Sequence, residues 1–191
     1  MGKKMLRKDV RLRIAAMSCS QKELASACMR LHVKECIDSC NAGVVALFAP
    51  LSDEPQMWPL VEELSKSKTV VLPRVEGDVM NFYCYTTDGL SKGFFGIMEP
   101  VEGEAVEPSV IDMIVVPGVA FTADGWRMGR GKGYYDKYMS RDGFRAVKVG
   151  ICYSCQLVDE LPVEAHDVGM DKVIYKLEER LHGAALVVWV S

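Results

Sequence analysis

The sequence predicts an α/β fold built on a largely parallel sheet, and two observations carry that prediction. Apolar runs rich in valine and isoleucine lie near residues 44–48, 69–72, 112–116 and 147–151, each with the length of a short buried strand. Segments with the apolar spacing of helices alternate with these runs. Such alternation favours a layered sheet with parallel pairing, because a parallel connection needs a long crossover.

Two helices are predicted ahead of the first strand. Residues 3–17 carry one apolar stripe at helical spacing, formed by Leu6, Val10, Ile14 and Met17. A second helix is predicted to begin at residues 20–23, which have the form of a capping box, and to end at residues 41–43, which include a glycine. We expect its buried face to contain Leu24, Cys28 and Leu31.

The strand at 44–48 leads into two acids, Asp53 and Glu54, and then into a short helix with Trp58, Val61 and Leu64 toward the core. Both acids would favour the helix N-terminus through the helix dipole, and that structural role alone could explain them. The strand at 69–72 ends at Pro73 and Arg74.

Two further segments complete the middle and the end of the chain. Residues 80–85 are predicted to form a strand with one exposed face, and residues 86–109 contain enough glycine and proline to predict loops. The tail ends in an apolar stretch, residues 184–190, which suits an edge strand or a docking segment. No function is assigned to it.

Length and composition exclude several classes of protein. A chain of 191 residues fits one domain, residues 1–191, with a substantial core. The net charge of −3 argues against a general nucleic-acid binder. No apolar run approaches the roughly 20 residues of a membrane span, and no secretory signal follows the first lysines. We expect a cytoplasmic protein, a monomer, with small molecules as its partners.

The seven cysteines have no disulfide-framework pattern, and an odd number favours a reducing compartment. Cys152 and Cys155 form a C-x-x-C spacing, but no second cysteine or histidine pair lies at a distance suited to zinc. The sequence around them also lacks the context of a redox motif. We interpret this spacing as a coincidence.

The segment that carries the most chemical information is residues 112–139. A buried strand is stopped by Pro117-Gly118, and Asp124-Gly125 predicts a turn. Three glycines then alternate with basic residues, and a short helical segment begins at Tyr134. Glycines allow a close backbone approach, and Arg and Lys supply positive charge, so this loop is typical of an anion site. The basic residues are Arg127, Arg130 and Lys132, and the glycines are Gly129, Gly131 and Gly133.

Two common phosphate motifs do not match this loop. No Ser or Thr follows Lys132, as a Walker A loop would require, and the glycine spacing differs from that of a dinucleotide fingerprint. A flexible surface hairpin is the other reading of the loop. Three cations beside three glycines and two tyrosines favour the phosphate site.

The run Gly125-Trp126-Arg127-Met128-Gly129-Arg130-Gly131-Lys132-Gly133-Tyr134-Tyr135-Asp136 closely resembles the signature of the 5-formyltetrahydrofolate cyclo-ligase family. Residues 3–7, 48–54, 73–74 and 167–175 resemble other family segments in the same order, so the resemblance covers about residues 3–176. It implies a three-layer, Rossmann-like fold with a largely parallel central sheet flanked by helices. It also implies ATP-dependent conversion of 5-formyltetrahydrofolate to 5,10-methenyltetrahydrofolate, with release of ADP and phosphate.

The resemblance further implies a set of site residues. The phosphate-activating cations would be Arg127, Arg130 and Lys132. ATP would be bound by Lys3, Lys4, Arg7, Arg127, Gly129, Arg130, Gly131, Lys132, Gly133, Tyr134 and Tyr135. Folate would be bound by Ala49, Glu54, Phe95, Arg130, Lys132 and Tyr134. Mg²⁺ would be held by Asp136 and Asp171.

Each of these roles has a structural alternative. Lys3 and Arg7 share a helical face and could be solvated cations. Asp136 could pair with a nearby arginine, and Asp171 could cap a strand turn. Phe95 could pack under its loop rather than stack on an aromatic ring of folate. Arg74 could bind phosphate or a folate glutamyl tail, or could be a strand-end surface charge.

Two other functions remain open from the sequence. A phosphosugar isomerase or a coenzyme A transferase-like enzyme on a related fold would need an acid or base beside the loop but no ATP. A non-catalytic folate- or nucleotide-binding protein would keep the loop without the reaction. The complete set of Arg, Lys and Asp positions argues against lost catalysis.

Overall fold

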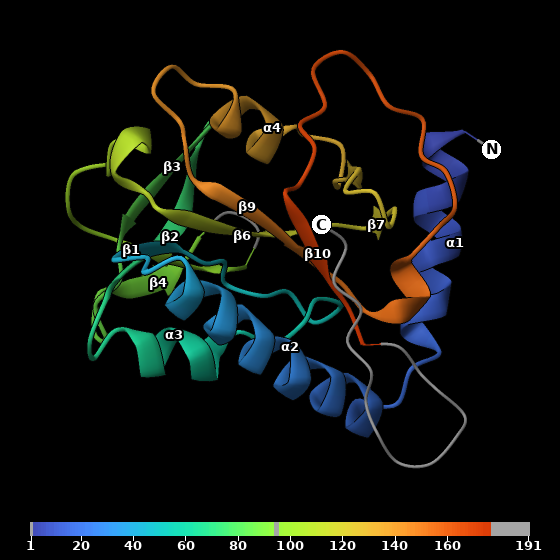
Figure 1. Ribbon diagram of the computed structural model, residues 1–191, viewed down its shortest axis with the longest axis horizontal. Coiled ribbons are helices and arrows are strands. Elements are labelled where there is room, and N and C mark those ends of the chain that lie inside the picture. The colour runs from blue at the N-terminus through green and yellow to red at the C-terminus, as the bar shows by residue number, and fades with distance from the viewer. Residues whose placement is uncertain (1, 94–95, 177–191) are drawn as a thin grey trace.

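The computed structural model describes residues 2–93 and 96–176 and shows a mixed α/β fold around a six-stranded sheet (Figure 1). The strand order is β10-β9-β6-β1-β2-β3. All neighbouring strands are parallel except the antiparallel pair β2 and β3, so the prediction of a mostly parallel sheet is confirmed. The strands are β1 (Val44–Ala46), β2 (Thr69–Glu76), β3 (Val79–Cys84), β6 (Met113–Pro117), β9 (Val147–Ile151) and β10 (Lys172–Ile174).

Helices cover both faces of this sheet. The helices are α1 (Lys3–Ala15), α2 (Cys19–Ser39), α3 (Trp58–Leu64) and α4 (Tyr134–Met139). Helices α2 and α3 lie on one face and α4 on the other, while α1 stands beside the end of the sheet (Figure 1). Successive residues of a strand point to opposite faces, so Val115 packs in the core that contains α1 to α3, and Val116 packs in the core that contains α4.

Short elements complete the chain. Two 3-10 turns, η1 (Pro108–Val110) and η2 (Ser154–Gln156), precede β6 and follow β9. Two small antiparallel pairs are β4 (Leu90–Lys92) with β5 (Met98–Pro100), and β7 (Ala120–Phe121) with β8 (Arg127–Met128). The predicted turn at Asp124-Gly125 lies between β7 and β8, where Gly125 has a φ of 99°. That conformation favours glycine.

The first helix is confirmed and the second is partly wrong. Leu6, Val10 and Ile14 are buried along α1, as predicted. In α2 the capping box is formed by Ser18 with Gln21, two residues before the expected start. Its predicted buried face is also wrong. Leu24 and Leu31 are 56% and 63% exposed, and the buried positions are Ala25, Ser26, Met29, Val33, Cys36 and Ile37.

The contacts of Ser26 account for the different buried face of α2. The Ser26 hydroxyl donates to the Lys22 carbonyl and accepts from the Gln56 amide at 3.0 Å. These contacts keep Ser26 inside and turn the neighbouring leucines outward, because one residue corresponds to about 100° around a helix.

None of the helices within the two described ranges is long and apolar enough to cross a membrane. All seven cysteines are free thiols. Cys152 is buried, and burial raises the pKa of its thiol, whereas the Cys155 thiol lies 3.5 Å from the Met17 sulfur. The C-x-x-C spacing therefore places one thiol in the core and the other against α1.

Candidate active site

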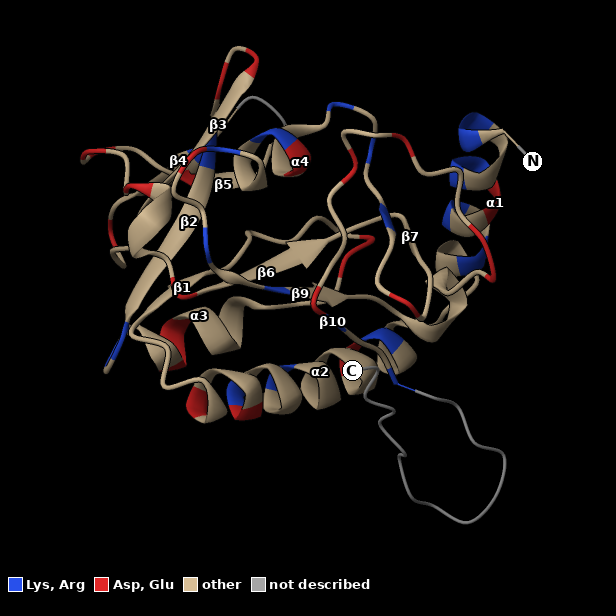
Figure 2. Cartoon of the chain, turned by 45° about the horizontal axis from the view of Figure 1, so that its top comes forward, with Lys and Arg blue, Asp and Glu red and all other residues tan. Residues whose placement is uncertain are grey.

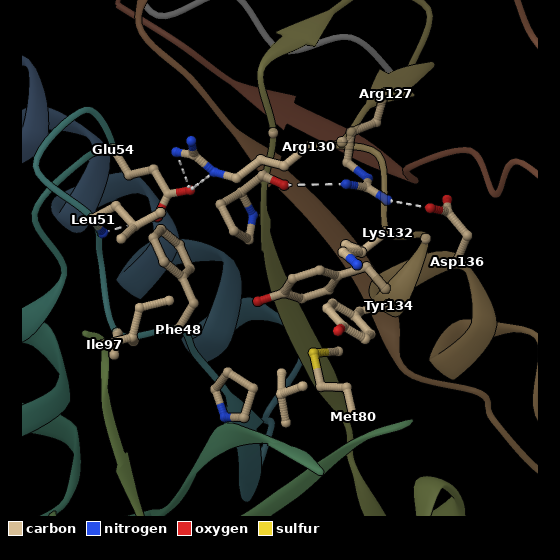
Figure 3. Close-up of a pocket in the computed structure, with 18 of the residues that line it drawn as sticks. Phe48, Leu51, Glu54, Met80, Ile97, Arg127, Arg130, Lys132, Tyr134 and Asp136 are labelled. Carbon is tan, nitrogen blue, oxygen red and sulfur yellow. Dashed lines mark hydrogen bonds and ion pairs between the residues drawn. The ribbon is translucent and has the colours of Figure 1, made fainter. Parts of the chain in front are cut away.

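A cavity of about 360 Å³ opens where β1 and β6 end (Figure 3). This volume lies within the usual range of ligand pockets, about 300–1,000 Å³. The carboxyl ends of parallel strands share one edge of a sheet, and ligands of open α/β sheets bind at that edge. The cavity is lined by the segments that follow β1 and β6 and by residues of β2, β3 and β5. The glycine-rich loop forms the rest of its wall.

The cavity has an apolar end and a charged end. Figure 3 shows Phe48, Ile97 and Met80 at one end, and Arg127 and Arg130 at the other. Ala49, which was predicted to touch folate, is buried in the wall. One pocket therefore offers apolar surface for a flat ring system beside cations for an anion.

Arg130 crosses the charged end and binds two adjacent carboxylates. Its Nε and Nη2 donate to Glu54 Oε1 at 3.0 and 2.8 Å. Its Nη2 and Nη1 also donate to Asp53 at 2.6 and 3.2 Å. Burial alone would raise the pKa of Asp53, but the Arg130 guanidinium outweighs burial and the pKa lies below its usual value.

Glu54, predicted to bind folate, is buried in the cavity wall. Its Oε2 accepts the Leu51 amide N–H at 3.0 Å, and its Oε1 accepts from Arg130. Both oxygens are thus held in fixed directions. Burying a carboxylate is costly unless it is paired, and Arg130 supplies that pair.

Arg127 is buried rather than presented to solvent. Its Nη2 lies 2.7 Å from Asp136 Oδ2, and its Nη1 donates to the Pro117 carbonyl at 3.3 Å. Within the described residues its buried Nε has no hydrogen-bond partner. The side chain therefore holds Asp136 and the end of β6 in the wall of the cavity.

Lys132 lines the same cavity but is exposed. Within residues 2–93 and 96–176, no hydrogen bond or ion pair involves its ammonium group. Its charge is therefore available to an incoming anion, in contrast to the charge of Arg127.

Helix α1 brings two of its predicted cations to this region. Arg7 Nε donates to the Gly129 carbonyl at 2.9 Å, and its guanidinium lies against Gly131. Lys3 instead pairs with Glu164 at 3.0 Å and with Asp167 at 3.2 Å, in the acidic segment that leads into β10 (Figure 2). Burial would lower the pKa of Lys3, but these two carboxylates raise it above its usual value. Lys4 is exposed.

The glycines of the loop permit backbone shapes that other residues resist. Gly131 and Gly133 have φ values of 107° and 67°, in the region that disfavours side chains. At Gly129 a Cβ atom would lie 2.8 Å from Arg127 Nη1, so this glycine lets the loop pass close to the buried arginine.

The two tyrosines that follow the loop differ in their surroundings. The Tyr134 hydroxyl donates to the Gly77 carbonyl at 3.3 Å, and its ring lines the cavity. Tyr135 also lines it. Burial raises the pKa of the Tyr135 hydroxyl and the nearby Glu54 carboxylate raises it further, against the smaller opposing effect of the Arg127 charge.

The structure does not bring Asp136 and Asp171 together. Asp136 lines the cavity, where it pairs with Arg127 and accepts the Val168 amide at 3.3 Å. Asp171 accepts the Lys148 amide at 2.7 Å and pairs with the Lys148 ammonium at 2.9 Å. It precedes β10, so it lies at the amino ends of the parallel strands, away from the cavity.

These positions match the structural alternatives for both acids: an arginine pair for Asp136 and a cap at a strand for Asp171. The described residues contain no group of three His, Cys, Asp or Glu side chains that could hold a metal ion. The arrangement therefore does not fit a magnesium site shared by the two aspartates.

Arg74 and Phe95 are the two other residues for which the sequence suggested a role. Arg74 stacks on the Tyr83 ring at 3.7 Å and donates to the Val101 carbonyl at 2.9 Å, so it faces away from a cavity lined by its neighbours Pro73 and Val75. Phe95 lies outside the described residues.

Sequence reasoning missed the contributions of Asp53, Asp167 and Glu99. Asp53 could have been suspected from its position beside Glu54. Nothing in the sequence distinguishes Glu99, which enters the cavity wall only because β5 packs beside β2.

Comparison with known proteins identifies one family. The family model described as the 5-formyltetrahydrofolate cyclo-ligase family matches residues 1–176. A 5-formyltetrahydrofolate cyclo-ligase of Mus musculus is 28% identical over 92% of this chain and 94% of its own length. One of Escherichia coli is 32% identical over 70% of this chain and 78% of its own.

Solved structures give the same answer for the fold. The 5,10-methenyltetrahydrofolate synthetase of Aquifex aeolicus aligns with a TM-score of 0.82 and 39% identity, over 92% of this chain and 90% of that one. The synthetase of Mycoplasma pneumoniae aligns with a TM-score of 0.75 and 27% identity, over 91% and 98%. With its signature loop folded into the wall of a ligand cavity, this chain belongs to the 5-formyltetrahydrofolate cyclo-ligase family.

Proposed function

We propose that this chain catalyses the ATP-dependent cyclisation of 5-formyltetrahydrofolate to 5,10-methenyltetrahydrofolate, with release of ADP and phosphate. The observation that carries the proposal is that one cavity joins an apolar end to a charged end, which is formed by Arg127, Arg130 and Lys132 of the glycine-rich loop. The whole chain would act as one domain, with the sheet and its two helical layers as a Rossmann-like scaffold.

The apolar end is suited to the ring systems of the folate. Phe48, Met80 and Ile97 provide the surface, and Glu54 provides the acceptor for ring N–H groups. An ionised carboxylate has about four acceptor positions. Arg130 and Leu51 use three of them, which leaves one on Oε2 for a ligand donor without any rearrangement.

The charged end is suited to the triphosphate. Lys132 carries an exposed ammonium, and Arg7 lies against the glycine-rich loop. Lys3 would join them if a phosphate displaced its two carboxylate partners. The glycines of the loop would let phosphate oxygens approach the backbone closely.

The reaction follows from the chemistry of a formamide, whose oxygen is a poor leaving group. Attack of the formyl oxygen on the γ-phosphorus of ATP forms an O–P bond, breaks the bond to the bridging oxygen and releases ADP. N10 then attacks the activated carbon and loses its proton. The C–O bond breaks, and phosphate leaves with the former formyl oxygen.

The residues would contribute position and charge rather than covalent chemistry. Lys132 and Arg130 would neutralise the transferring phosphoryl group, where negative charge shifts between oxygens. Arg127 is already committed to Asp136 and to Pro117, so we assign it the task of holding that wall of the cavity. Tyr134 and Tyr135 would separate the nucleotide from the folate.

Magnesium enters this proposal with the nucleotide, as Mg-ATP. Mg²⁺ usually keeps several waters and binds one or two carboxylates together with phosphate oxygens. Asp136 is engaged by Arg127, and Asp171 lies at the other edge of the sheet. No step of the reaction is assigned to an ion held by the protein alone.

The proposed function is tested by measuring the formation of 5,10-methenyltetrahydrofolate through its absorbance. We expect a rise only when enzyme, 5-formyltetrahydrofolate, ATP and magnesium are all present. If Mg-ATP or the folate raised the Tm of the well-folded protein but no product formed, the chain would be a binding protein. Stabilisation by sugar phosphates instead would favour an isomerase.

A further inference from the structure

Arg130 is shared between two neighbouring carboxylates that have different relations to the cavity. Glu54 is buried in the cavity wall. Asp53 lies outside the wall, with about a third of its side chain exposed. Since only Glu54 faces the space where a ligand would lie, the second carboxylate needs a separate explanation.

We propose that Asp53 is a positioning residue that holds Arg130 in place when the folate takes over Glu54. This inference rests on the proposed function. It assigns Asp53 a role in the reaction, through Arg130, because α3 begins only at Trp58 and has no acid in its first turn.

The hydrogen bonds of Arg130 divide into two sets. Its Nε and Nη2 face Glu54, whereas its Nη1 and Nη2 face Asp53. The contact of Nη2 with Asp53 is the shortest of the four, at 2.6 Å. A planar guanidinium can therefore leave Glu54 and remain held along its other edge.

Folate and Arg130 compete for Glu54. One acceptor position of Glu54 is unused, but the edge of a pterin presents adjacent N–H groups that a carboxylate binds in pairs. A second ligand donor requires Arg130 to give up one of its contacts with Oε1. The N–H group so released would be available at the charged end of the cavity, where the γ-phosphate is expected.

Asp53 fixes the position of the Arg130 guanidinium after its release from Glu54. Held by Asp53, it is a fixed donor, and fixed donors stabilise developing charge because they need little reorganisation during the reaction. Without Asp53, the Arg130 side chain would gain rotamer freedom. That freedom would have to be lost again during phosphoryl transfer. The expected loss is therefore in turnover and not in folate affinity.

The test is Asp53→Asn, which keeps the shape of the side chain and removes its charge. We expect kcat to fall by about tenfold or more, since small displacements of catalytic groups have large effects on rate. The KM for 5-formyltetrahydrofolate should change by less than about threefold, because Glu54 is intact. Asp53→Glu, which restores the charge, should recover part of the loss.

A matched control removes a carboxylate from an ion pair that is remote from the cavity. Glu63 pairs with Lys34 at 3.1 Å between α3 and α2. Glu63→Gln should retain wild-type kcat. Each variant should shift Tm by at most about 4 °C, as expected for an exposed ion pair.

A double-mutant cycle then separates positioning from a general loss of charge. In an Arg130→Lys background, the ammonium cannot span two carboxylates, so Asp53→Asn should cost less than about threefold. An equal cost in both backgrounds, or an Asp53→Asn variant with the kinetics of Glu63→Gln, would overturn the inference. An inactive wild-type enzyme would instead refute the proposed function.

Discussion

Lys132 and Arg127 show how two cations of one loop take different tasks. Lys132 is exposed at the cavity, and no other described residue pairs with its charge. Arg127 is buried, 2.7 Å from Asp136, and is part of the wall. A buried pair is disrupted at a high cost when one partner is removed, whereas an exposed ammonium can be removed with little effect on folding.

This contrast gives the first residue-scale prediction. Lys132→Ala should lower turnover by about 10²-fold or more, because a charge that neutralises the transferring phosphoryl group is lost. Its Tm should stay within about 2 °C of wild type, since the change is at the surface. Steady-state kinetics and a thermal melt would check both parts. Near-normal turnover in the folded variant would show that Lys132 has no part in the reaction.

A second residue-scale prediction concerns Glu99, which is buried in the cavity wall. Burial raises its pKa above the usual 4.5, against the opposing effects of the Val75 amide and the Arg74 charge. The folded protein therefore binds the Glu99 proton more tightly than the unfolded chain does. Ionisation of Glu99 therefore does not reduce the free energy of unfolding below pH 4.5. It lowers that free energy as the pH rises through the pKa of Glu99 in the folded protein.

Glu99→Gln removes this penalty and retains an acceptor for the Val75 amide. The variant should melt a few degrees above wild type near neutral pH, and the two should melt alike below about pH 4.5. Thermal melts over a pH series would measure the difference. If the higher Tm of the variant persisted unchanged below about pH 4.5, the effect would not be due to the ionisation of Glu99.

At the scale of an element, close packing of β9 depends on a glycine. A Cβ atom at Gly150 would lie 2.6 Å from the Phe121 ring, and 3.1 Å from the Met170 side chain. Phe121 belongs to β7, which leads to the turn at Asp124-Gly125 ahead of the glycine-rich loop. The absence of a side chain at Gly150 thus lets the start of the site segment lie flat on the sheet.

Gly150→Ala should therefore lower the free energy of unfolding by about 1–3 kcal/mol, the usual cost of overpacking. Gly43→Ala is the matched control, because its Cβ would meet nothing closer than 3.6 Å and its φ is negative or extended. Urea denaturation of the two variants would test this. Equal stability of both would show that Phe121 moves aside at no cost.

At the scale of the whole molecule, the parts predicted correctly are those that depend on local pattern. The strand β6 (Met113–Pro117) is a continuous apolar run, and the loop at 125–136 carries its own glycines and charges. The conformation of such segments depends on their own residues and little on contacts with distant parts of the chain. The mostly parallel sheet follows from their alternation with helices.

The parts that could not be predicted depend on contacts between distant segments. Arg130 meets Glu54 across 76 positions of sequence, and no local pattern encodes that pair. The resemblance implies that Asp136 and Asp171 hold Mg²⁺ together, yet Asp171 precedes β10 and lies at the opposite edge of the sheet. The rotation of α2 likewise depends on the bond between Ser26 and Gln56.

Isotopic labelling of the formyl oxygen shows directly whether the charged end of the cavity delivers the γ-phosphate to a formyl group held at the apolar end. With ¹⁸O in the formyl group and Mg-ATP as co-substrate, mass spectrometry of the products should find the label in the released phosphate. Label released as water, or product formed without ATP cleavage, would show that ATP does not phosphorylate the formyl oxygen.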